Sequence, residues 1–416
     1  MPQIKITSAD DVTRSLALYV HIPWCVRKCP YCDFNSHPLE RQFATTKGLR
    51  SPAVVTTEDE GKTTVQIERL YSNYTAALLG DLEYVLPMVA HRPVGSIFIG
   101  GGTPSLMPPP MLAGLLQAID DSFQLAPNVE ITLEANPGAA GNFATFAALG
   151  VNRLSLGVQS FNDHHLAAIG RIHDAKQAIT AAQNVTLHFA NFNIDIMFAL
   201  PGQSHEEVEQ DIAMALSFAP PHLSCYQLTV EPNTPFATKL PHDLPDTDSA
   251  ASMGDTVAAM LVAAGYEHYE VSAFARPGQR CCHNMSYWQF DDYLGLGAGA
   301  HSKLSEIKDA ASPLLVRRQM RHKHPALYMQ NSPPRIQEEW LLNSQEVVLE
   351  YLMNALRLQD GFSYAQFGRQ TGLNAQLLES TLAGALKKGL LNVNSQHVKT
   401  TTLGQRYLNR LLLDLV

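Results

Sequence analysis

Short apolar runs alternate with longer stretches of helical periodicity through residue 228, and this alternation constrains the fold more than any other feature of the sequence. Strands and helices in this order are joined by right-handed crossovers into a parallel sheet. Six strands are expected, over residues 16–21, 96–99, 130–134, 153–158, 193–197 and 223–228. Because a closed barrel of this kind has eight strands, we predict an α/β chain built on a partial (βα)6 barrel.

Three cysteines follow the first expected strand. Cys25, Cys29 and Cys32 have CxxxCxxC spacing within one short loop. Iron–sulfur clusters are held by cysteine thiolates, so three thiolates leave one iron of a four-iron cluster free to bind an outside molecule. An open coordination position is typical of catalytic rather than structural metal sites. The alternatives are a zinc knuckle, which needs a fourth ligand at short spacing, and a disulfide, which an odd number of cysteines does not suit.

The cysteine loop and several further sequence words resemble the radical S-adenosylmethionine superfamily, and within it the coproporphyrinogen-oxidase-like branch with its heme-chaperone members. The words run from Tyr19 to Trp288 and are LYVHIPWC, GGGTPS, EANPG, GVQSF, IGRIH, DIMFALPGQ and HNMSYW. The resemblance implies a 4Fe-4S cluster on the three cysteines, whose free iron is chelated by the amino and carboxylate groups of S-adenosylmethionine. It also implies the partial barrel, with chemistry at the carboxyl ends of its strands.

A run of three glycines at 100–102, followed by Thr103, comes after the second expected strand. Glycines let the backbone approach a ligand without obstruction from side chains. Such a triplet is a weak sign of a binding loop when taken alone. The resemblance implies that Gly102 and Thr103 contact S-adenosylmethionine.

Glu134 is expected at the end of an otherwise apolar strand, a costly place for a carboxylate that has no partner. The resemblance assigns it to S-adenosylmethionine, and a salt bridge to Arg153 or Arg171 is the alternative. Tyr19 and Tyr31 match aromatic positions that contact the same ligand in the family, although a strand tyrosine also suits the core. Three residues match positions that bind a second S-adenosylmethionine in coproporphyrinogen dehydrogenases, with structural hydrogen bonding as the equal alternative: Gln159, Arg171 and Asp195.

The word HNMSYW contains a candidate heme ligand, His283. A neutral imidazole is a common axial ligand of heme iron, and the neighbouring Tyr287 and Trp288 could flank a flat macrocycle. In the heme-chaperone members this word is the heme-binding signature, so the resemblance implies that His283 binds heme; a structural histidine is the alternative. Cys281 and Cys282, just before it, are expected to be buried thiols or spare ligands.

One position of the cysteine loop separates two functions within the branch. Coproporphyrinogen dehydrogenases carry a further cysteine two residues after the third cluster ligand, and here that position is Phe34. The leading hypothesis is therefore a heme chaperone that holds the cluster, S-adenosylmethionine and heme, and passes heme to acceptor apo-hemoproteins. Oxygen-independent decarboxylation of coproporphyrinogen III is the alternative, and a structural cluster protein that scaffolds a complex is a third. Self-association on cluster assembly is a further expectation.

Composition shifts divide the chain into two domains. The partial barrel is expected over residues 1–305, with an aperiodic insertion rich in Thr, Lys and Glu at 39–68. Residues 306–335 are basic and contain proline, and we predict a linker there. The remainder, 336–416, is expected to form a small, mainly helical, winged-helix-like domain. Its helix signals are the apolar face Val348, Tyr351, Leu352, Ala355 and Leu356, the N-caps Ser363 and Asn374, and the C′ glycine Gly389.

Charge and cysteine usage argue against several classes of partner. Thirty Lys and Arg against 39 Asp and Glu give a net charge of −9, which disfavours nucleic acid held through its phosphates. No apolar stretch approaches the roughly 20 residues of a spanning helix, so no transmembrane segment is expected. Six cysteines, three of them at ligand spacing, suit a reducing compartment. We therefore expect a cytoplasmic protein.

Overall fold

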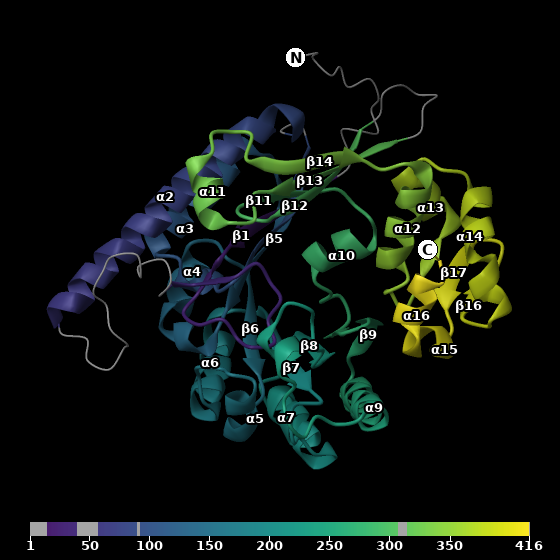
Figure 1. Cartoon of the computed structure of the whole chain (residues 1–416), viewed down its shortest axis with the longest axis horizontal. Helices are drawn as coiled ribbons and strands as arrows, with labels where there is room; N and C mark the ends of the chain where they lie inside the picture. Colours follow the sequence, from purple (N-terminus) through teal and green to yellow (C-terminus); the bar gives the residue numbers. More distant parts are fainter. Residues whose placement is uncertain (1–14, 40–56, 90–91, 307–313, 416) are drawn as a thin grey trace.

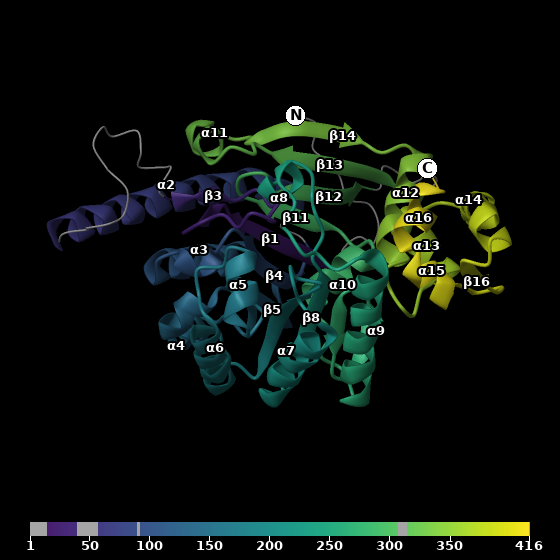
Figure 2. The ribbon, with the colours of Figure 1, turned by 60° about the horizontal axis from the view of Figure 1, so that its bottom comes forward.

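A twelve-stranded sheet organises the protein (Figure 1). The computed structural model describes residues 15–39, 57–89, 92–306 and 314–415, with the side chains of all of them except 57–64. The strand order is β14-β13-β12-β11-β1-β4-β5-β6-β7-β8-β10-β9. Figure 2 shows helices along the outer side of the curved sheet, and the short helix α10 (Cys282–Trp288) on the other side, near the C-terminal domain.

All six expected strands are present, adjacent and parallel, which confirms the partial barrel. A seventh strand, β11 (Tyr293–Leu296), pairs in parallel with the first one. The six are β1 (Leu16–Ile22), β4 (Val94–Gly101), β5 (Leu125–Ala135), β6 (Arg153–Gln159), β7 (Asn191–Phe198) and β8 (His222–Gln227).

Side chains alternate along these strands, so one face of the sheet is apolar and the other is largely polar. On β6, for example, Leu154, Leu156 and Val158 are buried in the main apolar core. The residues between them point into the barrel. Those of the inner face that line its cavities are Tyr19, Phe98, Glu134, Arg153, Ser155, Gln159, Asn193, Asp195 and Ser224. The fold therefore supplies an interior suited to a polar, charged ligand.

The outer helices complete the strand–helix units. Helix α2 begins at Thr57, so residues 57–68 of the expected insertion are helical, while residues 40–56 lie outside the described part. The longer helices are α2 (Thr57–Val89), α3 (Pro109–Ser122), α6 (Ala175–His188), α7 (His205–Ser217) and α9 (Thr247–Ala263). Shorter elements are β2 (Trp24–Cys25), β3 (His37–Pro38), η2 (Pro104–Leu106), η3 (Pro137–Asn142), α4 (Phe143–Ala148), α5 (Asp163–Ala168), α8 (Pro235–Thr238) and α11 (Pro325–Gln330).

Antiparallel strands extend both edges of the sheet. One edge carries β10 (Ala273–Ala275) and β9 (Glu267–Glu270). The other carries β12 (His301–Glu306), β13 (Leu315–Arg321) and β14 (Ile336–Leu341). The linker expected at 306–335 is therefore wrong, because β13 and α11 fall within it and β13 pairs with strands on both sides. Since β14 also belongs to this sheet, the first domain extends to Leu341.

The C-terminal domain lies to one side of the sheet (Figure 1) and packs around a second apolar core, which also includes Phe290 and Val316 of the first domain. Asn343, Ser363 and Asn374 cap its helices as side-chain acceptors, and Gly389 has the positive φ of a C′ glycine. Its elements are α12 (Ser344–Ala355), β15 (Phe362–Ser363), α13 (Tyr364–Thr371), α14 (Ala375–Lys387), β16 (Leu391–Val393), β17 (His397–Thr400), α15 (Thr402–Arg406) and α16 (Leu408–Leu413). None of the helices in the described residues is long and apolar enough to cross a membrane.

Candidate functional site

The three cysteines of the loop after β1 line one cavity of about 660 Å³ at the carboxyl ends of the parallel strands. All three are free thiols and half-buried. The Cys29 Sγ lies 3.9 Å from Nη1 of Arg171, and the Cys32 Sγ lies 3.8 Å from Oγ of Ser36. Burial raises the pKa of Cys25 and of Cys32, so a bound metal would have to promote loss of their protons.

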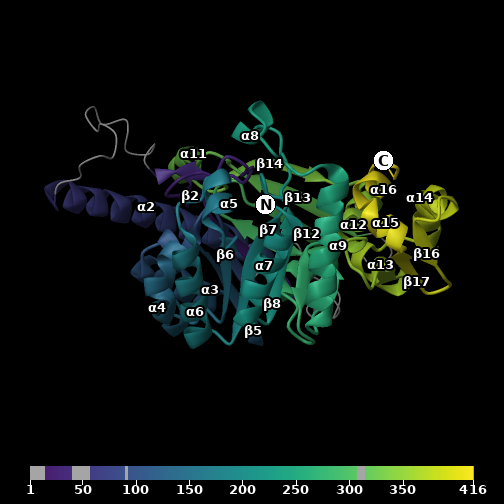
Figure 3. The ribbon, with the colours of Figure 1, turned by 90° about the horizontal axis from the view of Figure 1, so that it is seen from below.

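Neighbouring segments hold this cysteine loop from several sides. The backbone N–H of Phe236, in α8, donates to the carbonyl of Pro30, and the side chain of Arg27 donates to the carbonyl of Gly170. Figure 3 shows α8, which contains Phe236, and α5, which precedes Gly170. On the opposite side, the Asn35 amide donates to the carbonyls of Ala298 and Lys323. The loop is therefore fixed by residues that lie in α8 or shortly after α5, β11 and β13. These elements are far apart in the sequence.

The donor set fits an iron–sulfur cluster better than a single zinc ion. Among the described residues, no three His, Cys, Asp or Glu side chains converge on one point where a metal ion could bind. A zinc site requires its ligands on one centre, whereas a cluster distributes its thiolates over separate irons. Three thiols spread around one cavity, with no fourth ligand among the described residues, therefore suit a cluster with an open iron.

Gly102 and Thr103 begin the turn next to the cysteine loop. The N–H of Gly102 donates to the carbonyl of Ile22, and the N–H of Thr103 donates to that of Trp24, each at 2.8 Å. A Cβ atom at position 102 would lie 2.6 Å from the carbonyl oxygen of Trp24. The approach of the two backbones therefore requires glycine.

We expect Gly102→Ala to weaken binding of S-adenosylmethionine by more than about tenfold, because the turn must move away from Trp24 and carry Thr103 with it. Equilibrium dialysis on the cluster-reconstituted protein measures this. Gly114→Ala is the matched control, since a Cβ there meets nothing within 4 Å. Equal affinities of Gly102→Ala and wild type would contradict the role of the turn.

Glu134 lies at the carboxyl end of β5 and accepts a hydrogen bond from the N–H of Gly101 at 3.0 Å. Burial and the nearby Asp195 raise the pKa of Glu134 to about 8. Among the described residues no ion pair joins Glu134 to Arg153 or Arg171, because Arg153 lies 3.9 Å from Glu130 and Arg171 donates to Asn136 and Gly157. A buried carboxyl without a cationic partner is suited to a ligand that brings positive charge, such as an ammonium or sulfonium group.

Arg171, Gln159 and Asp195 line the same cavity but are also held by protein groups. The Arg171 guanidinium donates to the Asn136 side chain at 2.6 Å and to the carbonyl of Gly157 at 2.7 Å. Gln159 has a φ of 75° and accepts a hydrogen bond from the Tyr226 hydroxyl. A non-glycine residue in this conformation is costly and is found preferentially at functional sites.

Tyr31 also lines the larger cavity, whereas Tyr19 and His283 line a second, inner chamber of about 220 Å³. The two spaces share Glu134, Ser155 and Asp195, so the chamber adjoins the larger cavity deeper in the barrel. The Tyr19 hydroxyl bonds to Nδ1 of His21 at 2.9 Å. The predicted site residues therefore form two groups rather than one.

His283 is sealed inside this chamber. Its Nδ1 bonds to the Ser96 hydroxyl and its Nε2 to the Tyr287 hydroxyl, each at 3.0 Å. Burial lowers the pKa of His283 to about 3, so the imidazole is neutral. Ser96 lies five residues before Gly101 on β4, which is about 16 Å along a strand. His283 therefore lies well below the cysteine loop, with the chamber between them.

Comparison with known proteins agrees with this geometry. Residues 19–215 match the model of the Radical SAM superfamily, and residues 342–407 match the HemN C-terminal domain. "Heme chaperone HemW" of Escherichia coli K12 is 38% identical over 400 residues, covering 95% of this chain and 97% of that protein. The protein of the same name from Mycobacterium tuberculosis H37Rv is 31% identical, covering 96% and 93%. This chain belongs to the HemW family of the radical SAM superfamily.

The solved structure of E. coli coproporphyrinogen III oxidase (HemN), a radical SAM enzyme, supports the fold of this HemW-family chain. The TM-score is 0.74 at 22% identity, with 97% of this chain and 90% of that one covered. The HemN C-terminal match also agrees with a second domain that begins after β14. Membership of the radical SAM superfamily implies a 4Fe-4S cluster and S-adenosylmethionine.

Several residues of the two cavities were not singled out from the sequence. Asn136 donates to the Thr103 hydroxyl and accepts from Arg171, and it lies in the word EANPG, two residues after Glu134. Tyr226 orients Gln159. Arg357 reaches the rim of the larger cavity from the C-terminal domain, where it stacks on Trp288. Of the three, only Asn136 could have been proposed from the sequence, because it lies in a recognised motif. Tyr226 and Arg357 reach the cavity only through the tertiary structure.

Proposed function

We propose that this chain is a heme chaperone that binds a 4Fe-4S cluster through Cys25, Cys29 and Cys32, S-adenosylmethionine in the larger cavity, and heme through His283, for transfer to an acceptor apo-hemoprotein. The main support for this proposal is that one barrel interior joins a cavity lined by three thiols to a chamber lined by the neutral imidazole of His283. When bound, the cluster would supply an open iron site and one-electron chemistry.

The residues of the larger cavity divide into binding roles. Gly102 and Thr103 are proposed to receive the polar end of S-adenosylmethionine, and Glu134 to face its positive charge. Tyr31 closes the cavity beside the cysteine loop. Gln159 and Asp195, on β6 and β7, extend the polar lining away from the cysteines, whereas Arg171 lies beside Cys29.

Binding of heme iron by His283 requires a local rearrangement. The neutral state of the imidazole favours coordination, but the Tyr287 hydroxyl occupies Nε2 and His283 is 1% exposed. Tyr287 must therefore turn away, and α10 must move from the strands, before a macrocycle can reach the ring. In this proposal the closed arrangement is the heme-free state.

Phe34 favours the chaperone over a coproporphyrinogen dehydrogenase. It is 61% exposed and lines the larger cavity at the position where, in the family, the dehydrogenases carry a further cysteine. A phenyl ring cannot act as the proton or electron donor that a thiol could provide. It instead gives the cavity rim an apolar surface suited to a flat ring or a partner protein.

The test is a hemin titration on anaerobically reconstituted wild type and His283→Ala, followed by the Soret band, with coproporphyrinogen turnover assayed on the same samples. We expect one heme per wild-type chain, affinity at least about tenfold lower in the variant, and no porphyrin product. His268→Ala is the control, because this histidine of β9 lines neither cavity. Product formation together with heme binding independent of His283 would assign the chain to the dehydrogenases.

A further inference from the structure

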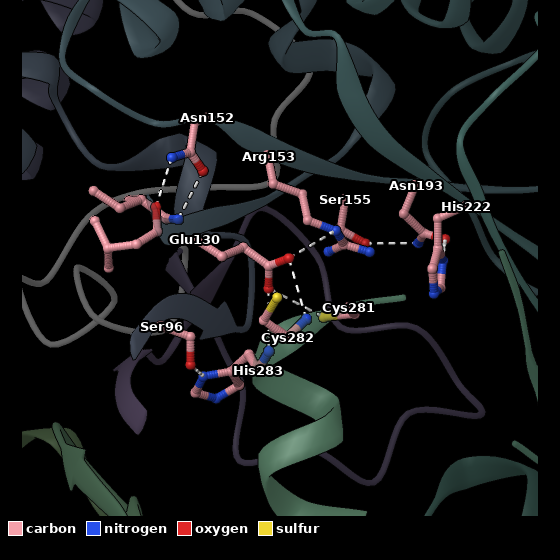
Figure 4. Close-up of polar contacts among 12 residues, drawn as sticks. Ser96, Glu130, Asn152, Arg153, Ser155, Asn193, His222, Cys281, Cys282 and His283 are labelled. Carbon is pink, nitrogen blue, oxygen red and sulfur yellow. Dashed lines mark hydrogen bonds and ion pairs between the residues drawn. The ribbon is translucent and has the colours of Figure 1, made fainter. Parts of the chain in front are cut away.

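The inner chamber contains a buried cation that the proposed function has not used. Arg153 begins β6, its side chain is 3% exposed, and it lines the chamber together with Ser155, Asn193 and Ser224. Figure 4 shows Arg153 between Glu130 and Ser155. Its guanidinium forms no hydrogen bond with any of the described residues, and its Nε is buried without a hydrogen-bond partner among them. A buried guanidinium whose donors are unpaired is costly to keep, and such a group calls for a ligand or ordered water.

The nearest carboxylate does not satisfy this guanidinium. Glu130 approaches Arg153 only to 3.9 Å, between Oε2 and Nε. The Glu130 oxygens instead accept the backbone N–H groups of Cys282 at 3.2 Å and His283 at 3.1 Å, and the Cys281 thiol (Figure 4). Glu130 thus fixes the start of α10 and leaves the N–H groups of Arg153 available.

The other acidic groups near Arg153 are poor counter-ions. Asp195 accepts hydrogen bonds from Asn193 and Ser155, and burial raises its pKa. Burial also raises the pKa of Glu134 to about 8. Among the basic groups, burial keeps His283 neutral. The Arg153 side of the chamber therefore favours an anionic group.

We infer that the inner chamber binds a carboxylate group through Arg153, and that in the proposed heme chaperone this group is a propionate of the heme. The inference rests on the proposed function. Arginine pairs with carboxylates through two parallel hydrogen bonds, and Asn193 and Ser224 line the same space. At about 220 Å³ the chamber is smaller than pockets that enclose whole drug-sized ligands. In the closed state it has room for a short carboxylate arm but not for the porphyrin ring, which reaches His283 only after α10 has moved.

Esterification of the heme propionates provides a direct test. Heme and heme dimethyl ester are titrated into wild type and Arg153→Gln, both with reconstituted cluster. We expect wild type to bind heme about 10- to 100-fold more tightly than the diester, and Arg153→Gln to bind the two alike. Equal affinities in wild type, or an undiminished preference for heme in Arg153→Gln, would overturn the inference.

Two further variants keep the test decisive if Arg153→Gln fails to fold. Arg153→Lys retains the charge without the paired geometry and should show a smaller preference for heme. Glu130→Gln removes the neighbouring negative charge and should increase that preference. If neither variant changes the ratio of the affinities for heme and for the diester from its wild-type value, Arg153 does not bind the propionate. Circular dichroism and S-adenosylmethionine binding verify the fold of each variant.

The outcomes also distinguish a failure of this inference from a failure of the proposed function. They further distinguish a heme propionate from a small free carboxylate as the ligand of Arg153. Failure of wild type to bind either heme or its diester would reject the heme chaperone itself, whereas equal binding of both would reject the role of Arg153 alone. Sodium propionate added to wild type should weaken binding of heme but not of the diester. If propionate raises the thermal midpoint of wild type but not of Arg153→Gln, while heme and diester bind alike, the ligand is a small free carboxylate and not heme.

Discussion

Replacement of Cys25, Cys29 and Cys32 by serine together is expected to abolish cluster binding and leave the apo-protein folded. The three thiols lie half-buried in a loop and belong to none of the apolar cores that the described residues form, so exchanging sulfur for oxygen removes little packing. A serine hydroxyl is a poor ligand for iron that thiolates hold. Iron and acid-labile sulfide measured after anaerobic reconstitution should fall from about four of each per chain to background.

Cys225→Ser is the matched control for this experiment, with the opposite expected result. Cys225 is 4% exposed in β8 and packs in the main core, where burial raises its pKa. A buried hydroxyl without a partner costs about 1–3 kcal/mol, so this variant should lose stability and keep its cluster. Retention of four irons in the triple variant would show that the loop is not the cluster site.

The second large effect is expected for Asp292→Asn, which should lower the free energy of unfolding by about 3–5 kcal/mol, as breaking buried ion pairs does. Asp292 is 4% exposed and accepts from Arg92 and Lys303, each at 2.8 Å. The amide removes the negative charge that both buried cations contact. Urea unfolding followed by circular dichroism measures the loss. Asp255→Asn, in an exposed pair with Arg406, should have little effect.

The pH dependence of this variant has a defined sign. Burial alone would raise the pKa of Asp292, but Lys303 and Arg92 outweigh burial and hold it well below its ordinary value. A carboxyl with a lowered pKa stabilises the fold above its ordinary value of about 3.9 and loses that contribution as the pH falls further. The difference in the free energy of unfolding between wild type and Asp292→Asn should therefore become smaller below about pH 4. A difference that stays constant with pH would show that the loss of stability does not come from the charge of Asp292.

The central strands could be predicted from the sequence because each combines a short apolar run with a following helix. The edge strands could not be predicted from the sequence, and β13 illustrates the physical reason. Its sequence LVRRQMR looks like a basic linker, but Arg317 pairs with Glu306 on one neighbouring strand and Glu339 on the other. Those partners come from separate segments, and only the assembled sheet turns the charged run into a strand.

The candidate site divides in the same way. The cysteine loop and the turn at Gly102 follow single strands, so local words were enough to propose them. The inner chamber has no local signal, because Arg153, Asn193 and His283 meet only when three distant elements pack together. The sealed state of His283 is also a tertiary property, since its partner Ser96 is 187 residues away in sequence. The word HNMSYW predicted that His283 is a heme ligand, but it could not predict that the imidazole is buried.

The position of β1 has a consequence for the synthesis of the protein. β1 lies between β4 and β11, and Ala17 pairs with Tyr293, 276 residues later in the chain. At roughly 5–20 residues per second, a ribosome adds β11 about 15–55 s after β1. During that interval β1 is an edge strand, and the thiols just after it lie outside a finished barrel. Because cysteine oxidation follows exposure, the newly made chain is more vulnerable to oxygen than the folded one.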